Sequence, residues 1–370
     1  MVNKHEQWEL TQMQSLPLEL KIRKTQQRIR EWYNYFNGSV YLSFSGGKDS
    51  TVLKHIIDNM YNDIPSVFVN TGLEFPEIQT FVREIKTGKY NCFNTNIEIL
   101  RPEMKFNGVI LNYGYPVISK EVAEVVEQAR KYITAKQEGF EKCPYSYSYR
   151  RLKGLGEYAK TTVKNKRYTW EEQQALSPYP PSKKDRSTYN CEKYEYLLEA
   201  PFDISSKCCN VMKKKPLHEY EKENKRYPYI ATMASESAMR KQAWLRTGCN
   251  TFDSKKKQSK PMSFWTEQDV LHYIQLHNIP YASIYGDIAT QEDGFLKTTG
   301  ADRTGYIFCM FGCHLEKEPN RFQRLEQTHP KQYAWCIGGG TEIDGKWVPD
   351  ENGLGLGKVL DFIGVNYENN

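Results

Sequence analysis

Hydrophobic and polar positions in the first hundred residues predict helices that alternate with short buried strands. Apolar residues between positions 17 and 36 recur at helical spacing and fall on one face. Three short apolar runs, at 40–44, 66–70 and 97–100, are typical of buried strands. Strands that alternate with helices indicate an α/β fold with a doubly wound parallel sheet. Ligands of such sheets bind at the carboxyl ends of the strands.

Further along the chain the same patterns recur less regularly. A charged helix is expected over 119–132 and a strand over 229–233. A second helix is expected over 270–277, with Thr266 and Asp269 placed to cap its first turn.

Composition narrows the classes of function. The 370 residues carry a net charge of +6, which permits an anionic ligand or a nucleic acid without requiring either. The N-terminus is polar and no apolar run reaches about 18 residues, so we expect no signal peptide, no membrane span and a cytoplasmic location. Nine clustered cysteines in such a chain favour free thiols or metal ligands over disulfides.

The most informative segment follows the first strand and reads Ser45-Gly46-Gly47-Lys48-Asp49-Ser50. Glycines let backbone N–H groups approach an anion, and the N-terminus of the helix that follows favours negative charge. Serine and threonine hydroxyls and the Lys48 charge add further donors. The loop is not the Walker motif, which needs GxxxxGK followed by Ser or Thr. An ordinary serine–glycine turn is the alternative, but the strand–turn–helix context favours a phosphate site.

Two pairs of cysteines form the second chemical signal. Cys208 and Cys209 are adjacent, and Cys309 and Cys313 lie about a hundred residues later. Adjacent cysteines rarely form a disulfide with each other, whereas four thiolates from two segments suit a [4Fe–4S] cluster or a tetrahedral zinc ion. The three-residue gap in the second pair favours the cluster over zinc. Buried cysteines that bind no metal are the alternative.

Residues 142–167 form a basic stretch with eight Lys or Arg against one Glu and with interleaved tyrosines. Basic and aromatic residues together can hold phosphates and stack bases, which predicts a nucleic-acid contact. A solvated insertion or a contact between subunits would have the same composition.

Taken in order, the SGGKDS loop, the double cysteine and the later pair resemble the phosphoadenosine phosphosulfate reductase family. The loop itself resembles that of the PP-loop ATP pyrophosphatases. Four further segments carry the resemblance: NTGLEFPE at 70–77, CCNVMKKKPL at 208–217, SESAMR at 235–240 and WTEQDV at 265–270. The resemblance covers roughly residues 35–320 and implies a Rossmann-like PP-loop fold that binds an adenine nucleotide.

The resemblance also implies roles for individual residues. The nucleotide-binding set is Ser45, Gly46, Gly47, Lys48, Asp49, Ser50, Thr51, Asn70, Thr71, Gly72, Ser237 and Arg240. Within this set Lys48, Asp49 and Arg240 are expected to be catalytic. The expected metal ligands are Cys208, Cys209, Cys309 and Cys313.

Three parts of the chain are expected from these motifs. Residues 1–36 would form an N-terminal helix, and residues 37–260 a nucleotide-binding α/β domain with a basic, tyrosine-rich insertion at about 140–190. Residues 261–370 would form a helical region that carries the second half of the cysteine cluster.

The resemblance leaves the reaction open among three alternatives. We expect ATP-dependent adenylation, with magnesium bridging the phosphates, coupled to sulfur transfer onto a nucleic acid or a small molecule. A sulfur donor such as a cysteine desulfurase and a second copy of the chain are then expected partners. The first alternative is reduction of adenylyl sulfate or its 3′-phosphate to sulfite. The second is a non-catalytic nucleotide- or nucleic-acid-binding accessory protein.

Departures from the family pattern bear on this choice. Sulfonucleotide reductases end in a Glu-Cys-Gly motif that this sequence lacks, and Cys336 is the one substitute. They also tend to have degraded phosphate loops, whereas this loop is intact. The spacing CxxxC at Cys309 and Cys313 replaces their CxxC.

Overall fold

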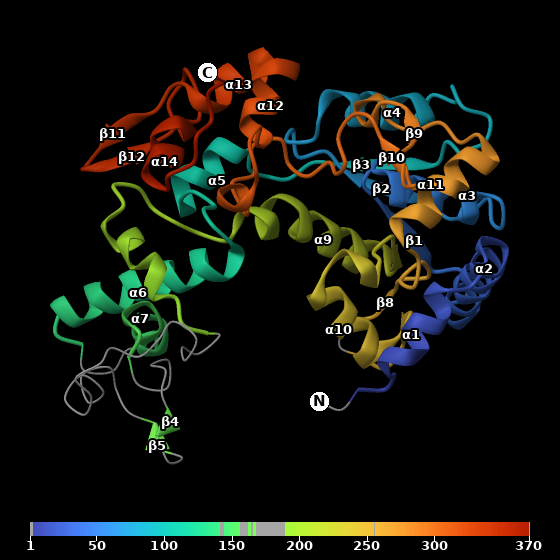
Figure 1. Cartoon of the computed structure of the whole chain (residues 1–370), viewed down its shortest axis with the longest axis horizontal. Coiled ribbons are helices and arrows are strands. Elements are labelled where there is room, and N and C mark those ends of the chain that lie inside the picture. Colours follow the sequence, from blue (N-terminus) through green and yellow to red (C-terminus); the bar gives the residue numbers. More distant parts are fainter. Residues whose placement is uncertain are drawn as a thin grey trace. The chain divides into compact units, whose positions relative to one another are not determined.

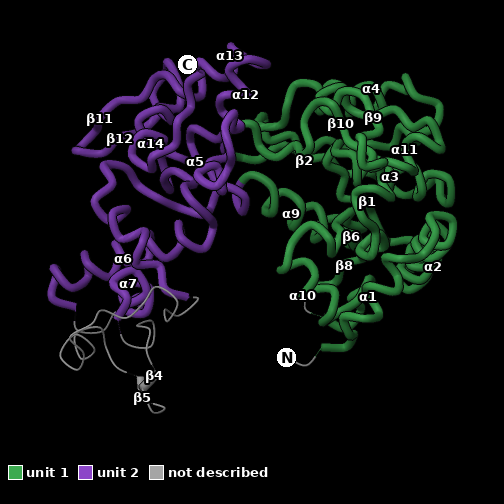
Figure 2. The backbone as a smooth tube through the Cα atoms, viewed as in Figure 1, with its two compact units in different colours: residues 1–103, 212–307 green, residues 104–211, 308–370 purple. Residues whose placement is uncertain are grey.

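The computed structural model describes residues 3–140, 144–155, 189–254 and 256–369, together with the two short strands β4 (Thr162–Val163) and β5 (Lys166–Arg167). The chain forms two compact units, and each is assembled from two separate stretches (Figure 2). Unit 1 comprises residues 1–103 and 212–307. Unit 2 comprises residues 104–211 and 308–370.

Unit 1 contains a six-stranded sheet with the order β3-β2-β1-β6-β8-β7. The strands are β1 (Val40–Phe44), β2 (Ser66–Val69), β3 (Ile97–Leu100), β6 (Tyr227–Ile230), β7 (Asn250–Thr251) and β8 (Gln258–Ser259). All neighbouring strands pair in parallel except β7, which runs antiparallel to β8 at the edge. The α/β fold with a mostly parallel sheet is therefore confirmed, although β6 begins two residues before the expected strand.

Helices of unit 1 cover both faces of this sheet (Figure 1). They are α1 (Gln7–Gln14), α2 (Leu18–Tyr35), α3 (Lys48–Asp58), α4 (Pro76–Lys86), α9 (Lys215–Asn224), α10 (Ala238–Thr247) and α11 (Glu267–His277). Side chains alternate along a strand, so Leu42 and Phe44 of β1 join the larger core with α2, α3 and α4. Tyr41 packs on the opposite face against Tyr220 of α9, with 5.1 Å between ring centroids.

The register of the sheet brings the ends of two strands to one edge. Phe44 of β1 pairs with Phe68 of β2, so the segments that follow both strands begin at nearly the same level. Short elements complete unit 1: the 3₁₀ turns η5 (Ala234–Glu236) and η6 (Ser283–Tyr285), and the hairpin β9 (Ile288–Thr290) and β10 (Leu296–Thr298). A π-helical turn, η4 (Asn210–Lys214), leads into α9.

Unit 2 is mainly helical in its described part. Its elements are α5 (Phe106–Tyr113), α6 (Lys120–Gln137), α7 (Ser146–Lys153), η3 (Glu192–Glu199), η7 (Cys313–Leu315), α12 (Arg321–Thr328), α13 (Pro330–Ile337), β11 (Thr341–Ile343), β12 (Lys346–Val348) and α14 (Leu356–Phe362). Arg130 of α6 ties the following segments to this helix, because its guanidinium donates to the carbonyls of Phe202 at 2.7 Å and of Leu197 and Ala200 at 2.8 Å. Ser119 caps α6 by accepting the Val122 N–H at 3.1 Å.

The length and apolar character of the helices also bear on membrane insertion. In the part of the chain that the structure describes, no helix combines the length and the apolar character needed to cross a bilayer.

Candidate functional site

The loop between β1 and α3 turns sharply, and its backbone requires glycine at one position. Gly46 has a φ of +72°, in the left-handed region that glycine adopts readily. A Cβ atom there would lie 2.8 Å from Ile78 Cγ2 and 3.1 Å from Val82 Cγ2, both on α4. Gly46 therefore lets the chain pass close to α4 and places Gly47 at the N-cap of α3.

Hydroxyl groups hold the loop in its folded conformation. The Oγ atoms of Ser45 and Ser50 are 3.0 Å apart, and the Ser45 N–H donates to Ser50 Oγ at 3.3 Å. The Gly47 N–H lies 3.4 Å from Ser45 Oγ. Ser45 is exposed, whereas Ser50 and Thr51 are buried in α3. Of the three hydroxyl residues in and next to the loop, Ser45 is therefore the one that solvent reaches most freely.

Lys48 begins α3 and is held by residues far away in the sequence. Its Nζ atom lies 3.0 Å from Glu267 Oε1, at the first residue of α11. The same ammonium lies 5.0 Å from the centroid of the Tyr285 ring, and the Tyr285 hydroxyl is 2.6 Å from Thr304 Oγ1. Burial raises the pKa of Tyr285 to about 12, so this hydroxyl stays protonated near neutral pH.

Asp49 lies in the first turn of α3 and interacts electrostatically with charges from α10, from α11 and from residue 303. Burial raises the pKa of its carboxyl group, and the positive charges of Lys48, Arg303 and Arg240 oppose this shift while Glu267 adds to it. Burial lowers the pKa of Arg240, as does the neighbouring charge of Arg303. Three cations from three distant segments therefore converge beside the loop, and an anion would relieve their mutual repulsion.

The predicted residues after β2 form a turn at the same edge of the sheet. Asn70 Oδ1 accepts the Gly72 N–H at 3.0 Å, and Thr71 donates through its hydroxyl to Glu74 Oε1 at 2.8 Å. The Thr71 N–H donates to Glu74 Oε2 at 3.0 Å. Asn70 and Thr71 therefore organise the turn, and Gly72 supplies its positive φ of +76°.

Ser237 and Arg240 lie at the start of α10. Ser237 caps this helix by accepting the Arg240 N–H at 3.2 Å, and the Arg240 guanidinium is in close contact with Glu236. The charge of Arg240 acts on Asp49, and the assignment of this pair to a nucleotide site stays a prediction. The predicted set of site residues did not include Glu267, Tyr285, Thr304 or Arg303. The WTEQDV motif at 265–270, which contains Glu267, was the one sequence feature that pointed to this residue.

The four predicted cysteine ligands all belong to unit 2 and are free thiols. Cys208 Sγ donates to Cys209 Sγ at 3.9 Å. This hydrogen bond and burial raise the pKa of Cys208, and the charges of Cys209 and Cys309 raise it further. Burial raises the pKa of Cys313 to about 12, and the charge of Cys309 adds to this. Electrostatic coupling thus links all four thiols in one group, the cysteine group.

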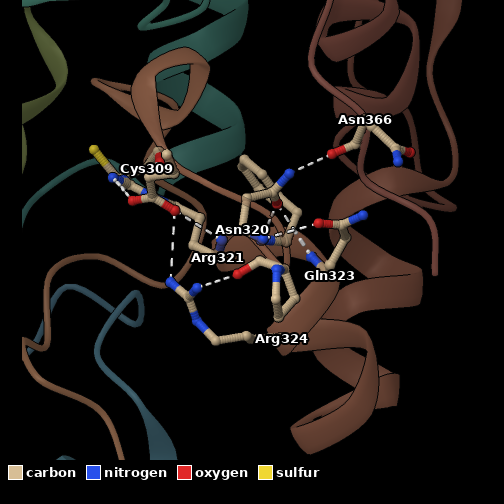
Figure 3. A network of polar contacts seen from close by, with 9 residues as sticks. Cys309, Asn320, Arg321, Gln323, Arg324 and Asn366 are labelled. Atoms are coloured by element: carbon tan, nitrogen blue, oxygen red, sulfur yellow. Dashed lines mark hydrogen bonds and ion pairs between the residues drawn. The ribbon is translucent and has the colours of Figure 1, made fainter.

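Arg321 supports this group from the start of α12 (Figure 3). Its Nη1 atom donates to the Cys309 carbonyl at 2.7 Å, and its Nε atom donates to Glu316 Oε1 at 2.9 Å. Burial raises the pKa of the Cys309 thiol, and the Arg321 charge opposes this shift. A cation beside two thiols favours their thiolate forms, which are the forms that bind metals.

The donor chemistry of the cysteine group fits a thiolate-bound metal centre, because thiolates are metal ligands and a bound cation would favour the deprotonated form of these buried thiols. Both ring nitrogens of His314, next to Cys313, are also buried and lack a hydrogen-bond partner in the described part of the chain. Within the described residues, however, no three Cys, His, Asp or Glu side chains are arranged to hold one metal ion. The metal and its ligand set therefore stay predictions.

Two other predicted features have a clear structural setting. Cys336 is fully buried in α13, and burial raises its pKa well above the ordinary value.

The basic stretch 142–167 lies partly outside the described residues. In its described part, Arg151 forms an ion pair with Glu121 and Lys153 forms one with Glu195, so these two charges have partners within unit 2.

Comparisons with known proteins agree with the fold and the loop. A family model described as phosphoadenosine phosphosulfate reductase domain matches residues 39–178 and 177–313. The phosphoadenosine 5′-phosphosulfate reductase of Alkalilimnicola ehrlichii is 31% identical over 91 residues, which are 25% of this chain and 36% of that protein. The enzyme of the same name from Vibrio vulnificus is 27% identical over 97 residues, 26% of this chain and 36% of that protein.

The matched region thus spans about a third of the length of these curated relatives. Among solved structures, phosphoadenylyl-sulfate reductase from Candida auris aligns with a TM-score of 0.36 and 12% identity, covering 78% of this chain and 97% of that one. The family model matches well over half of the chain, from the first strand of the sheet to the second cysteine pair. The protein therefore belongs to the phosphoadenosine phosphosulfate reductase domain family.

Proposed function

We propose that this protein is an enzyme that binds an adenylyl nucleotide with its phosphates on the loop Ser45–Ser50 and reduces a sulfonucleotide to sulfite. The substrate would be adenylyl sulfate or its 3′-phosphate. One observation carries the proposal: the loop leads into the N-terminus of α3, where Lys48 meets Glu267 at the start of α11 and where the charges of Arg240 and Arg303 act on Asp49. Helix N-termini and cations both favour bound negative charge. The names of the curated relatives support the substrate class.

In this proposal the chain's own residues bind and orient the anionic part of the nucleotide. The loop amides and Lys48 would hold the phosphate, while Arg240 and Arg303 would neutralise the charge next to it. Attack of a thiolate on the sulfur atom would form a thiosulfonate and expel the nucleotide phosphate, and these cations would stabilise the negative charge on that leaving group. Attack of a second thiol of an external reductant on the thiosulfonate would then release sulfite and leave a disulfide. Asp49 is partly buried among them, and it would keep them oriented when the site is empty.

A second candidate is ATP-dependent adenylation coupled to sulfur transfer. Two observations favour it. Cys336, the substitute for the reductase thiol, is fully buried, so its thiolate form is disfavoured and a substrate cannot reach it without local unfolding. The loop also keeps every residue of the SGGxDS pattern, which suits the pyrophosphate of ATP. Lys48 would then stabilise the departing pyrophosphate, with magnesium bridging the phosphates.

The cysteine group would hold a [4Fe–4S] cluster in either reaction, with zinc as the alternative. Its ligands would be Cys208, Cys209, Cys309 and Cys313. When bound, a cluster of this kind would supply redox or electrostatic chemistry. A nucleic acid substrate, a cysteine desulfurase as sulfur donor and a homodimer remain parts of the second candidate.

Calorimetric titration of the anaerobically purified chain tests the proposal. ATP, adenylyl sulfate and its 3′-phosphate would be titrated into the wild type, into Lys48→Met and into the control Lys89→Met, which removes an exposed lysine of unit 1. We expect the sulfonucleotides to bind more tightly than ATP, and Lys48→Met to weaken binding about tenfold, the loss of one charged hydrogen bond. Lys89→Met should bind like the wild type.

Product analysis separates the two candidates. Sulfite formed from a sulfonucleotide in the presence of a thiol reductant supports reduction. Pyrophosphate released from ATP, with no sulfite from either sulfonucleotide, supports adenylation instead. A wild type that binds none of the three nucleotides would contradict both.

A further inference from the structure

The ammonium group of Lys48 is already neutralised by a carboxylate of the same unit. Its Nζ atom lies 3.0 Å from Glu267 Oε1. The two side chains differ greatly in accessibility, because Lys48 is 6% exposed and Glu267 is 53% exposed. Lys48 is therefore fixed in the site, whereas the Glu267 carboxylate can turn into solvent without moving the backbone.

The backbone of Glu267 is held firmly at this position. Thr266 and Asp269 form a capping box at the start of α11, with the Thr266 N–H donating to Asp269 Oδ2 at 2.7 Å. Asp269 in turn accepts from the buried Lys21 Nζ at 2.7 Å. Val270 is fully buried on the next turn. Glu267 therefore stays beside the loop whether or not a ligand is present.

Carboxylates already lie beside the cations of the loop when no ligand is bound. Lys48, Arg240 and Arg303 face the carboxylates of Asp49, Glu236 and Glu267. An added phosphate therefore competes with these carboxylates for the same cations.

Glu267 is the carboxylate that can leave at the lowest cost. Glu236 is 11% exposed and also accepts the Met233 N–H at 2.8 Å, which caps η5. Asp49 lies within the first turn of α3 and is partly buried, so water reaches its carboxylate less freely than that of Glu267. Glu267, by contrast, is half exposed, so water can solvate its carboxylate after Lys48 has been released.

We propose that Glu267 is a resident counter-anion that occupies Lys48 in the empty site and that a nucleotide phosphate must displace. Glu267 thereby sets how strongly the loop binds anions and favours ligands with more negative charge, which compete better for Lys48. The inference rests on the proposed function, since it takes the loop as the phosphate site. Glu267 acts through Lys48 and is a specificity-determining residue, without contact to the reacting atoms.

Titration of the full chain with sodium pyrophosphate tests this inference. The proteins would be the wild type, Glu267→Gln, Lys48→Met, the double variant and the control Glu292→Gln, which makes the same charge change at an exposed position of unit 1. An ion pair of this exposure is worth about 1 kcal/mol, so Glu267→Gln should bind pyrophosphate about fivefold more tightly. The gain should disappear in the Lys48→Met background, because the cation that Glu267 blocks is then absent.

Two further measurements distinguish competition between Glu267 and the phosphate from a merely structural role of Glu267. Glu267→Asp keeps the charge but shortens the side chain, so its affinity should lie between those of the wild type and Glu267→Gln. The affinity gain should shrink as sodium chloride is raised, because salt screens the ion pair. A merely structural residue would instead lower affinity at every salt concentration.

Distinct outcomes would overturn the inference and the proposed function. Equal or weaker binding by Glu267→Gln overturns the inference while leaving the phosphate site in place. An equal gain in Glu292→Gln or in the Lys48→Met background also overturns it, since the effect would then not act through Lys48. If the wild type and every variant fail to bind pyrophosphate and nucleotides, the proposed function itself is wrong.

Discussion

Replacing Gly46 by alanine tests whether the loop geometry depends on glycine. The change forces a residue with a Cβ into a φ of +72°, which costs roughly 1–2 kcal/mol. The new Cβ would also lie 2.8 Å from Ile78 Cγ2 and 3.1 Å from Val82 Cγ2. Both side chains are buried, so overpacking adds about 1–3 kcal/mol. We expect Gly46→Ala to lower the free energy of unfolding by about 2–5 kcal/mol.

Gly72 provides a matched control on the neighbouring turn. Its φ is +76°, but a Cβ there would meet nothing within 4 Å. Gly72→Ala should therefore show only the backbone contribution of roughly 1–2 kcal/mol. Urea unfolding would be followed by tryptophan fluorescence, since Trp32 and Trp265 are fully buried in unit 1. Equal losses in the two variants would refute the steric argument and with it the close approach of the loop to α4.

Three further predictions concern buried charge, pH and the cysteine group. Lys54 is fully buried and its Nζ lies 2.9 Å from Asp58 Oδ2, so Lys54→Met should lower unfolding free energy by about 3–5 kcal/mol. Adding Asp58→Asn should recover part of this loss in urea unfolding, and no recovery would contradict the ion pair. Burial lowers the pKa of His55 to about 4 from 6.5. Between pH 4 and 6.5 the unfolded chain therefore binds more protons than the folded chain, so the free energy of unfolding should fall as the pH falls from about 6.5 to 4. In His55→Gln this pH dependence should be absent. Cys309→Ser should abolish bound iron and any visible absorption, whereas the control Cys92→Ser in unit 1 should leave both unchanged. If Cys309→Ser retains its iron, Cys309 is not a ligand.

Local patterns in the sequence were sufficient to predict the strand–loop–helix unit and the starts of several helices. The apolar run before Ser45 and the glycines after it lie within a few residues of each other, so the pattern specifies the turn directly. The same holds for α11, where Thr266 and Asp269 are three residues apart and form the predicted capping box. The strand β6 was placed two residues late, because its Pro228 interrupts the strand pattern.

Long-range relations could not be predicted in the same way. Glu267 meets Lys48 across 219 positions of sequence, and no local periodicity encodes that contact. Arg303 lies only six residues before Cys309 in the sequence, yet its charge acts on Asp49 of the distant loop. The two units are each built from two stretches, which composition alone does not reveal. Pairing across a sheet and between helix ends depends on packing, so it appears only in the folded chain.

Hydrogen–deuterium exchange with and without nucleotide tests the central claim most directly. The measurement would compare amide protection of the anaerobic wild type with saturating adenylyl sulfate, its 3′-phosphate or ATP. The account predicts added protection at residues 45–51 and at the first turns of α10 and α11, and loss of that protection in Lys48→Met. Binding that protects other segments and leaves residues 45–51 unchanged would contradict the assignment of this loop as the phosphate site.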